Sequence, residues 1–101
     1  MNNLFENLDM PTERELVSIL AQSKEVRIER IVSAGQISDW YDQSEREFVA
    51  LLQGRAHILF EDGRLIKLKK GDTLFFDAHE RHKVVYTSKR PVCVWLCVFY
   101  D

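Results

Sequence analysis

From residue 26 the hydrophobic pattern changes to a period of two, and short, largely apolar runs separated by turn signals follow, which is the pattern of β-strands. The predicted strands cover about residues 26–31, 47–53, 56–61, 64–70, 73–76, 83–87 and 92–100. Gly54 ends one strand, and Asp62-Gly63 between two others is a strong β-hairpin signal. Residues 35–46 are polar and aromatic, and fit either an irregular strand or a loop over a pocket mouth. Seven or eight short strands with turns at this spacing predict an all-β sandwich or barrel.

The residues before this series predict one short α-helix. Thr12 and Glu15 form a Thr-x-x-Glu capping box, which satisfies backbone donors at the start of a helix. Leu16, Ile19 and Leu20 would give the helix one apolar face, ending near Ser23. Such a helix is too short to be stable alone, so we expect it to pack on the outside of the barrel. The expected organisation is an N-terminal extension over residues 1–25 and a β-barrel over residues 26–101.

Length and composition describe one globular domain. The chain has 101 residues, 46% hydrophobic and 30% charged, and a net charge of −2 from 14 basic and 16 acidic side chains. This balance gives no electrostatic reason to expect nucleic acid or a membrane surface as a partner. Cys93 and Cys97 lie too far apart on one strand to bridge, so we expect free thiols and a reducing cytoplasm. The N-terminal residues do not form the apolar run of a signal peptide.

Two spacings link the chain to a known family. Glu47 and Gly54 match the end of one cupin motif, in which a glutamate is followed after six residues by a glycine. Gly71, Asp77-Ala78-His79 and His82 reproduce the spacing of a second cupin motif, a glycine, five residues, Pro-x-Gly, two residues and a histidine. Over about residues 26–100 the chain therefore resembles the small single-domain cupins. The resemblance implies a jelly-roll β-barrel (a double-stranded β-helix) with a site inside it.

The resemblance also implies a divalent metal inside the barrel, such as iron, manganese, nickel or zinc. The His-x-His pair of the first cupin motif is absent, and counting back from Glu47 puts either Tyr41 and Gln43 or Trp40 and Asp42 in its place. Both alignments stay open. Imidazole suits iron, nickel, copper and zinc, whereas carboxylates and amides favour harder ions such as manganese. The candidate metal ligands are His82, Glu47, Gln43 and Asp42.

Each of these residues also has a structural interpretation. His82 fits a hydrogen-bonded core histidine as well as a ligand, and Glu47 fits a strand terminus. His79 lies in a polar turn and is better placed as a rim residue than as a ligand. Aromatic side chains in a barrel this small usually fill its interior, but Trp40 and Tyr41 lie in a polar stretch. The candidate ligand-binding residues are Trp40, Tyr41, His79 and Tyr86.

Two functions follow from these candidates. In the first, the barrel holds a divalent metal and a small polar or carboxylate-bearing molecule, and the metal acts as a Lewis acid or redox centre in an enzyme. In the second, the barrel binds or senses a small molecule without a metal and without catalysis. The sequence does not decide between an enzyme and a binding module.

The last predicted strand bears on assembly. Residues 93, 95, 97 and 99 lie on one face and residues 94, 96, 98 and 100 on the other, and both faces are apolar. One barrel buries only one of these faces, so the N-terminal helix or another subunit should cover the second. We therefore expect a homodimer.

Overall fold

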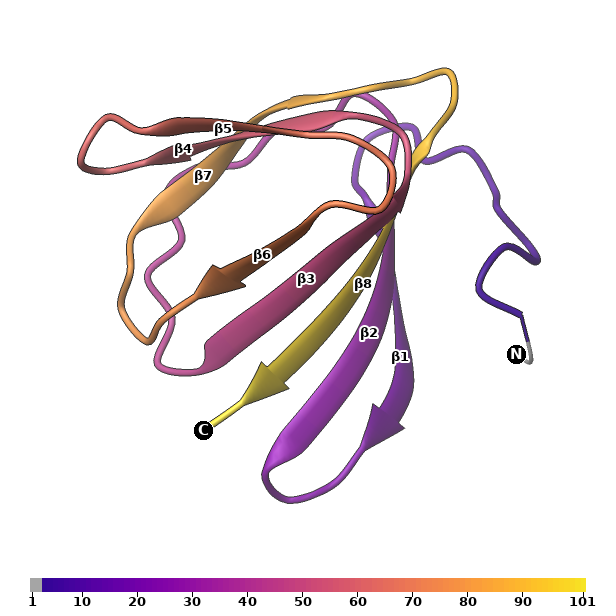
Figure 1. The fold of residues 1–101 in the computed structure, drawn as a ribbon. Helices are drawn as coiled ribbons and strands as arrows, with labels where there is room; N and C mark the ends of the chain where they lie inside the picture. Colours follow the sequence, from indigo (N-terminus) through magenta and orange to yellow (C-terminus); the bar gives the residue numbers. More distant parts are fainter. Residues whose placement is uncertain (1–2) are drawn as a thin grey trace.

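The structure is a computed structural model that describes residues 3–101, and its eight strands form two antiparallel sheets (Figure 1). The strands are β1 (Leu16–Gln22), β2 (Val26–Ser33), β3 (Arg46–Gln53), β4 (Ala56–Phe60), β5 (Leu65–Leu68), β6 (Thr73–Phe76), β7 (His82–Thr87) and β8 (Cys93–Tyr100). One sheet has the order β1-β2-β8-β3-β6, and the other has the order β5-β4-β7. The all-β prediction is confirmed.

The two sheets face each other and enclose one hydrophobic core. Figure 1 shows β5, β4 and β7 as one layer above the five-stranded layer, with the two layers closer at one end than at the other. Strands β3, β4 and β8 supply most of the buried side chains, including Leu51 and Ile58, which are 0% and 2% exposed. Inward residues alternate with outward residues along β4 and β8, as the period of two requires. The inner faces meet near the middle of β3 and β8, and this is where the cavity described below lies.

The helix predicted from Thr12 to Ser23 is wrong. The described residues contain no helix, and β1 is instead an edge strand paired antiparallel with β2. The carboxylate of Glu15 accepts a hydrogen bond from the Ser33 hydroxyl (3.2 Å) across the sheet. Five residues with an apolar pattern fit a strand as well as a helix, and Val17 and Ile19 are β-branched, which favours a strand. Pairing with β2 therefore overrides the local capping signal. β1 belongs to the same sheet as the barrel strands, although it lies within the expected extension.

An N-terminal segment of turns and bends takes the place of the expected helix on the outer face of the five-stranded sheet. Arg30 on β2 is 5% exposed, and its guanidinium donates to the backbone carbonyls of Leu4 (3.3 Å), Glu6 (2.6 Å) and Asn7 (3.4 Å). These bonds hold the segment against the sheet beside Leu96, the partner of Arg30 on β8. The segment covers only part of this outer face, and other apolar side chains there stay exposed. The homodimer that would cover them remains a prediction.

Residues 35–45 follow the edge of β7 and form no strand. The Ser38 backbone N–H donates to the Val84 carbonyl (2.9 Å), and the Ser38 hydroxyl accepts from the Val84 N–H (2.9 Å). Tyr41 makes an isolated antiparallel bridge with His82. This stretch is therefore a loop tied along β7, which is one of the two alternatives expected from the sequence.

Both cysteines are buried free thiols, as predicted. Among residues 3–101, no helix is long and apolar enough to cross a membrane. The cytoplasmic location stays a prediction.

Candidate functional site

A cavity of about 260 Å³ lies between the two sheets. Its walls come from the inward faces of seven strands, all except β5, and from the loop at residues 41–43. Just over half of the lining residues are aliphatic or aromatic, and the others include three glutamates. The lining residues are Glu15, Val17, Glu29, Ile31, Ser33, Tyr41, Gln43, Glu47, Val49, Ile58, Phe76, His82, Val84, Trp95, Cys97 and Phe99. This composition is typical of a small-molecule site.

Glu47 is the most deeply placed carboxyl group of the cavity. It occupies an inward position near the start of β3 and is 8% exposed. The Gln43 amide donates to its Oε1 (3.3 Å), and the Cys97 thiol donates a second hydrogen bond. Burial raises the pKa of Glu47 from 4.5 to about 7, more than these two hydrogen bonds lower it. Near neutral pH this side chain therefore exists in both protonation states.

Two further carboxylates face the same cavity. Glu29 on β2 is held by the Arg27 guanidinium (2.7 Å), and Glu15 accepts from the Ser33 hydroxyl. Burial raises the pKa of Glu15, and the negative charge of Glu29 raises it further. The charges of Glu29 and Glu15 also add to the rise in the pKa of Glu47. The cavity therefore carries a negative potential.

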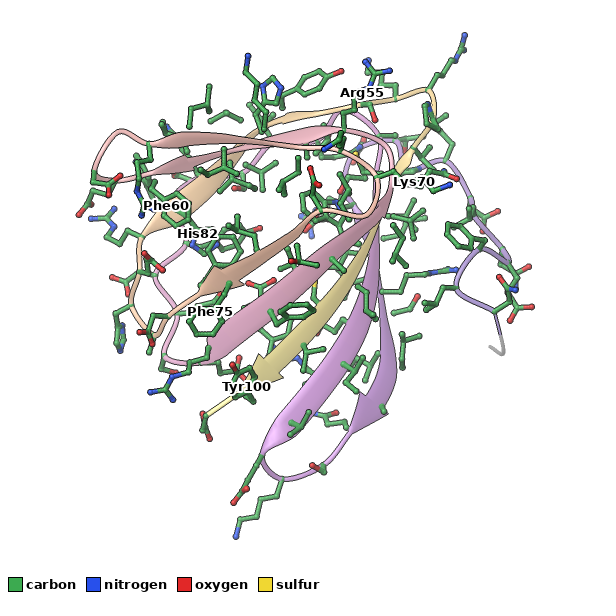
Figure 2. All side chains as sticks on the ribbon, in the orientation of Figure 1. Arg55, Phe60, Lys70, Phe75, His82 and Tyr100 are labelled. Atoms are coloured by element: carbon green, nitrogen blue, oxygen red, sulfur yellow. The ribbon has the colours of Figure 1, made fainter. Side chains whose placement is uncertain are left out.

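His82 lies at the start of β7, on the face that points toward the other sheet. Figure 2 shows its ring beside Phe60 in the space between the three-stranded sheet and β6. Its Nδ1 donates to the Glu80 carbonyl (2.9 Å), which leaves Nε2 as an acceptor in the neutral ring. The ring stacks on Phe76 with centroids 3.6 Å apart and planes at 9°. Burial lowers the pKa of His82, so the imidazole is neutral at pH 7.

The candidate residues from the sequence divide into two groups. Tyr41, Gln43, Glu47 and His82 line the cavity together. Their convergence places the Tyr41 and Gln43 alignment of the first motif inside the fold.

The other four candidates lie outside the cavity. Asp42 and His79 pair with each other on the surface (2.8 Å), with side chains 52% and 68% exposed. Trp40 lies beneath the charged ends of two basic residues of the β7 region, Arg81 and Lys83. Tyr86, 43% exposed, packs against His57 on the outer face of the three-stranded sheet.

Among the cavity residues that did not emerge from the sequence as candidates are Glu15, Glu29 and Cys97. Strand alternation places Glu29 on the same face as Ile31, so an acidic residue on a strand's apolar face was the available signal. The sequence pattern assigned Glu15 to the cap of a predicted helix, so its place in the cavity was not recognised. The Cys97 thiol is 1% exposed, and burial raises its pKa well above the usual value.

The cavity side chains do not fit a metal centre of the kind the resemblance implies. Among residues 3–101, no group of three or more His, Cys, Asp or Glu side chains is arranged to hold a metal ion. The cavity offers a single imidazole, whose Nε2 is its one unprotonated nitrogen. Gln43 directs its amide nitrogen, a donor, toward Glu47. We therefore derive no chemistry through a metal.

A family model described as the cupin domain matches residues 29–99, most of the chain. The chain belongs to the cupin family. The match spans β2 to β8 and so includes nearly every strand that lines the cavity. The resemblance inferred from Glu47, Gly54, Gly71 and His82 is confirmed. No protein of curated function matches the chain.

Solved structures agree with this assignment. A candidate mannose-6-phosphate isomerase from Ralstonia eutropha JMP134 is 35% identical, with a TM-score of 0.94 over 100% of this cupin and 97% of that chain. A cupin superfamily protein from Desulfitobacterium hafniense DCB-2 is 25% identical, with a TM-score of 0.77 over 91% and 82% of the two chains. The DMSP lyase DddQ from Ruegeria pomeroyi DSS-3 is 18% identical, with a TM-score of 0.75 over 87% and 47% of the chains, and shares the fold alone.

Proposed function

We propose that this cupin binds a small polar organic molecule, uncharged or positively charged, in the cavity between its sheets and without a metal. The observation that carries the proposal is the charge of the cavity wall. Glu15, Glu29 and Glu47 face the cavity, and no Lys or Arg of residues 3–101 is among its lining residues. An amine or ammonium group would be attracted by this wall, and hydroxyl groups could bond to the carboxyl groups and the His82 nitrogen.

A carboxylate or phosphate group would meet the opposite situation. Arg27 pairs with one carboxylate of this wall, Glu29, and also with Glu45, and its guanidinium covers the Phe99 ring at 4.4 Å. An anion would have to displace one of these partners to reach it. Two like charges 4 Å apart repel by about 4 kcal/mol at an effective dielectric constant of about 20. The carboxylate-bearing ligand expected from the sequence depended on a metal to offset this repulsion.

The aromatic residues of the wall favour the same class of ligand. Tyr41, Phe76, Trp95 and Phe99 line the cavity together with the carboxyl groups. The faces of aromatic rings attract organic cations, and this attraction is strongest where water is excluded. We assign Glu47 to the charged or hydroxyl group of the ligand, His82 Nε2 to a second donor on it, and Tyr41 to the cavity entrance.

Isothermal titration calorimetry with three matched probes tests this proposal. Benzylammonium, benzyl alcohol and benzoate share one ring and differ in charge. At pH 8, with EDTA-treated protein, we expect benzylammonium to bind at least tenfold more tightly than benzyl alcohol, and benzoate not to bind. Tenfold corresponds to about 1.4 kcal/mol, well below the full Coulomb term because water screens part of it.

Two variants control this experiment. Glu47→Gln should reduce the preference for the ammonium probe over the alcohol. Glu61→Gln, which removes an exposed carboxylate paired with Arg81 (2.9 Å), should leave the preference unchanged. The titrations are repeated with iron(II), manganese(II), nickel(II) and zinc(II). Benzoate binding that needs a metal and disappears in His82→Ala would overturn the proposal in favour of a metal site.

A second function is supported by the pKa of Glu47. A carboxyl group whose pKa is about 7 beside a neutral imidazole is suited to proton transfer at neutral pH. The Ralstonia protein is a candidate mannose-6-phosphate isomerase, and sugar isomerisation moves a proton between neighbouring carbons. A phosphate group would find no cation in the cavity wall, so an unphosphorylated sugar fits this site better.

Solvent deuterium exchange tests this second function. Mannose or fructose incubated in deuterated buffer with the protein should gain deuterium at the carbon next to the carbonyl, as followed by proton NMR. Glu47→Gln should abolish the exchange while the protein stays folded. Absence of exchange in the wild type, together with binding of the neutral or cationic probes, leaves binding without catalysis as the function.

A further inference from the structure

A second pocket, of about 380 Å³, adjoins the cavity at its entrance. Its walls include Glu15, Val17, Tyr41 and Val84, and the same four residues line the cavity. The two spaces are therefore neighbours across a shared wall. Tyr41, 39% exposed, stands where they meet. A molecule longer than the cavity would extend into the outer pocket.

One wall of the outer pocket is a fixed segment of chain. Residues 36–38 are tied to β7 by the paired bonds between Ser38 and Val84 and by the Thr87 hydroxyl, which donates to the Gln36 carbonyl (2.7 Å). These bonds hold Ile37 at the rim of the pocket. The wall is therefore formed before any ligand arrives.

The apolar side chains of this pocket are unusually exposed. Ile37 is 67% exposed and Val17 is 52% exposed. A single exposed aliphatic residue is common on protein surfaces. Here two of them, together with Tyr41, surround one hollow that shares four lining residues with a ligand-sized cavity.

The polar groups of the outer pocket are largely engaged. The Gln36 amide accepts from the Ala34 N–H and donates to the Thr12 carbonyl (3.4 Å), and the Ser38 hydroxyl accepts from Val84. Glu13 and Arg14 carry opposite charges on the same wall. The pocket therefore offers an occupant the apolar surface of Val17, Ile37 and Val84, and its charged lining residues are two acidic and one basic side chain.

We propose that the outer pocket holds an apolar tail of the ligand whose polar head lies in the cavity, so that the natural ligand is an elongated molecule with a cationic or hydroxyl head and a hydrocarbon tail. This inference rests on the proposed function, because it extends the same site outward. The occupant is fixed by three observations: the shared wall, the exposed Ile37 and Val17, and the engaged polar groups.

A homologous series of probes tests the inference. Propyl-, pentyl- and heptylammonium, and the 1-alkanols of the same lengths, are titrated into the protein by calorimetry. Each methylene group that enters the outer pocket should strengthen binding about twofold to fourfold, because its burial removes apolar surface from water. Ile37→Ser should reduce this gain for the longest probes and leave propylammonium unchanged. Leu65→Ser, which alters an exposed aliphatic side chain on the outer face of β5, should change neither.

The outcomes separate the two claims. Binding of the short ammonium probes with no gain along the series would overturn the outer pocket and leave the proposed function standing. A gain along both series without a preference for ammonium would support the outer pocket and contradict the cationic head. Equal effects of Ile37→Ser and Leu65→Ser would also contradict the inference. Failure of every probe to bind would overturn both claims.

Discussion

Replacing Glu47 by glutamine removes a carboxyl group that the fold keeps partly protonated. Glu47 is 8% exposed, and its pKa is raised from 4.5 to about 7, chiefly by burial. A rise of this size means that ionising Glu47 costs the folded protein about 3 kcal/mol relative to the unfolded chain. Glutamine has a similar shape, can accept from the Cys97 thiol and cannot ionise.

The sign of the pH dependence follows from the direction of this shift. The pKa of Glu47 is higher in the folded state, so its contribution to stability is fully present below about pH 4.5 and is lost as the pH rises through about 7. The Glu47→Gln variant lacks this loss. We expect wild type and variant to differ little at pH 5, and the variant to be more stable by about 2–3 kcal/mol at pH 8.

Urea unfolding followed by tryptophan fluorescence measures this difference, with Trp95 as a reporter in the core. Glu25→Gln, at an exposed position between β1 and β2, is the matched control and should show no such pH dependence. A difference between wild type and Glu47→Gln that is the same at pH 5 and pH 8 would refute the reasoning. So would a variant that is less stable than wild type at pH 8.

Three other predictions follow. Gly54→Ala should destabilise the fold more than Gly63→Ala. Both positions have positive φ, which costs about 1–3 kcal/mol for alanine, but only at Gly54 would the new Cβ lie 2.9 Å from the Cys93 Cα. Equal melting temperatures of the two variants would contradict this. Tyr41→Ala should weaken benzylammonium binding severalfold and Trp40→Ala should not, because Trp40 lies outside the cavity. A larger effect of Trp40→Ala in calorimetry would contradict this prediction. We expect sedimentation equilibrium to show a homodimer at micromolar concentration, since apolar side chains remain exposed on the outer face of the five-stranded sheet, and a monomer would disprove this.

The strands were predictable because their signals are local. The Asp62-Gly63 turn and the apolar runs along residues 47–53 and 92–100 can each be recognised from neighbouring residues alone. Glu47 and His82 were predictable as inward residues because their spacing to glycines matched a family pattern. Strand β1 was not predictable, because it forms by pairing with β2. Without that partner, the capping-box signal of Thr12 and Glu15 favours a helix.

The chemistry of the cavity was harder to predict for a related reason. Glu15, Glu29 and Glu47 lie far apart in the sequence and meet only because β1, β2 and β3 belong to one sheet. Asp42 and Gln43 are adjacent in sequence, but their side chains point to different sides of the loop. Gln43 bonds to Glu47 in the cavity, and Asp42 pairs with His79 on the surface. The bridge between Tyr41 and His82 and the bond from the His79 N–H to the Gln43 carbonyl (2.7 Å) orient this loop, and both join residues far apart in the sequence.

The most direct test of the central claim locates the probe within the protein. Isotopically labelled, EDTA-treated protein is titrated at pH 8 with benzylammonium and, separately, with benzoate, and amide shifts are followed by NMR. The account predicts that benzylammonium shifts the amides around Glu47, Cys97 and Glu29 at the cavity wall, and that benzoate leaves them unchanged. Shifts at the cavity wall with benzoate alone, or shifts confined to the outer surface around Trp40 and Tyr86, would contradict it.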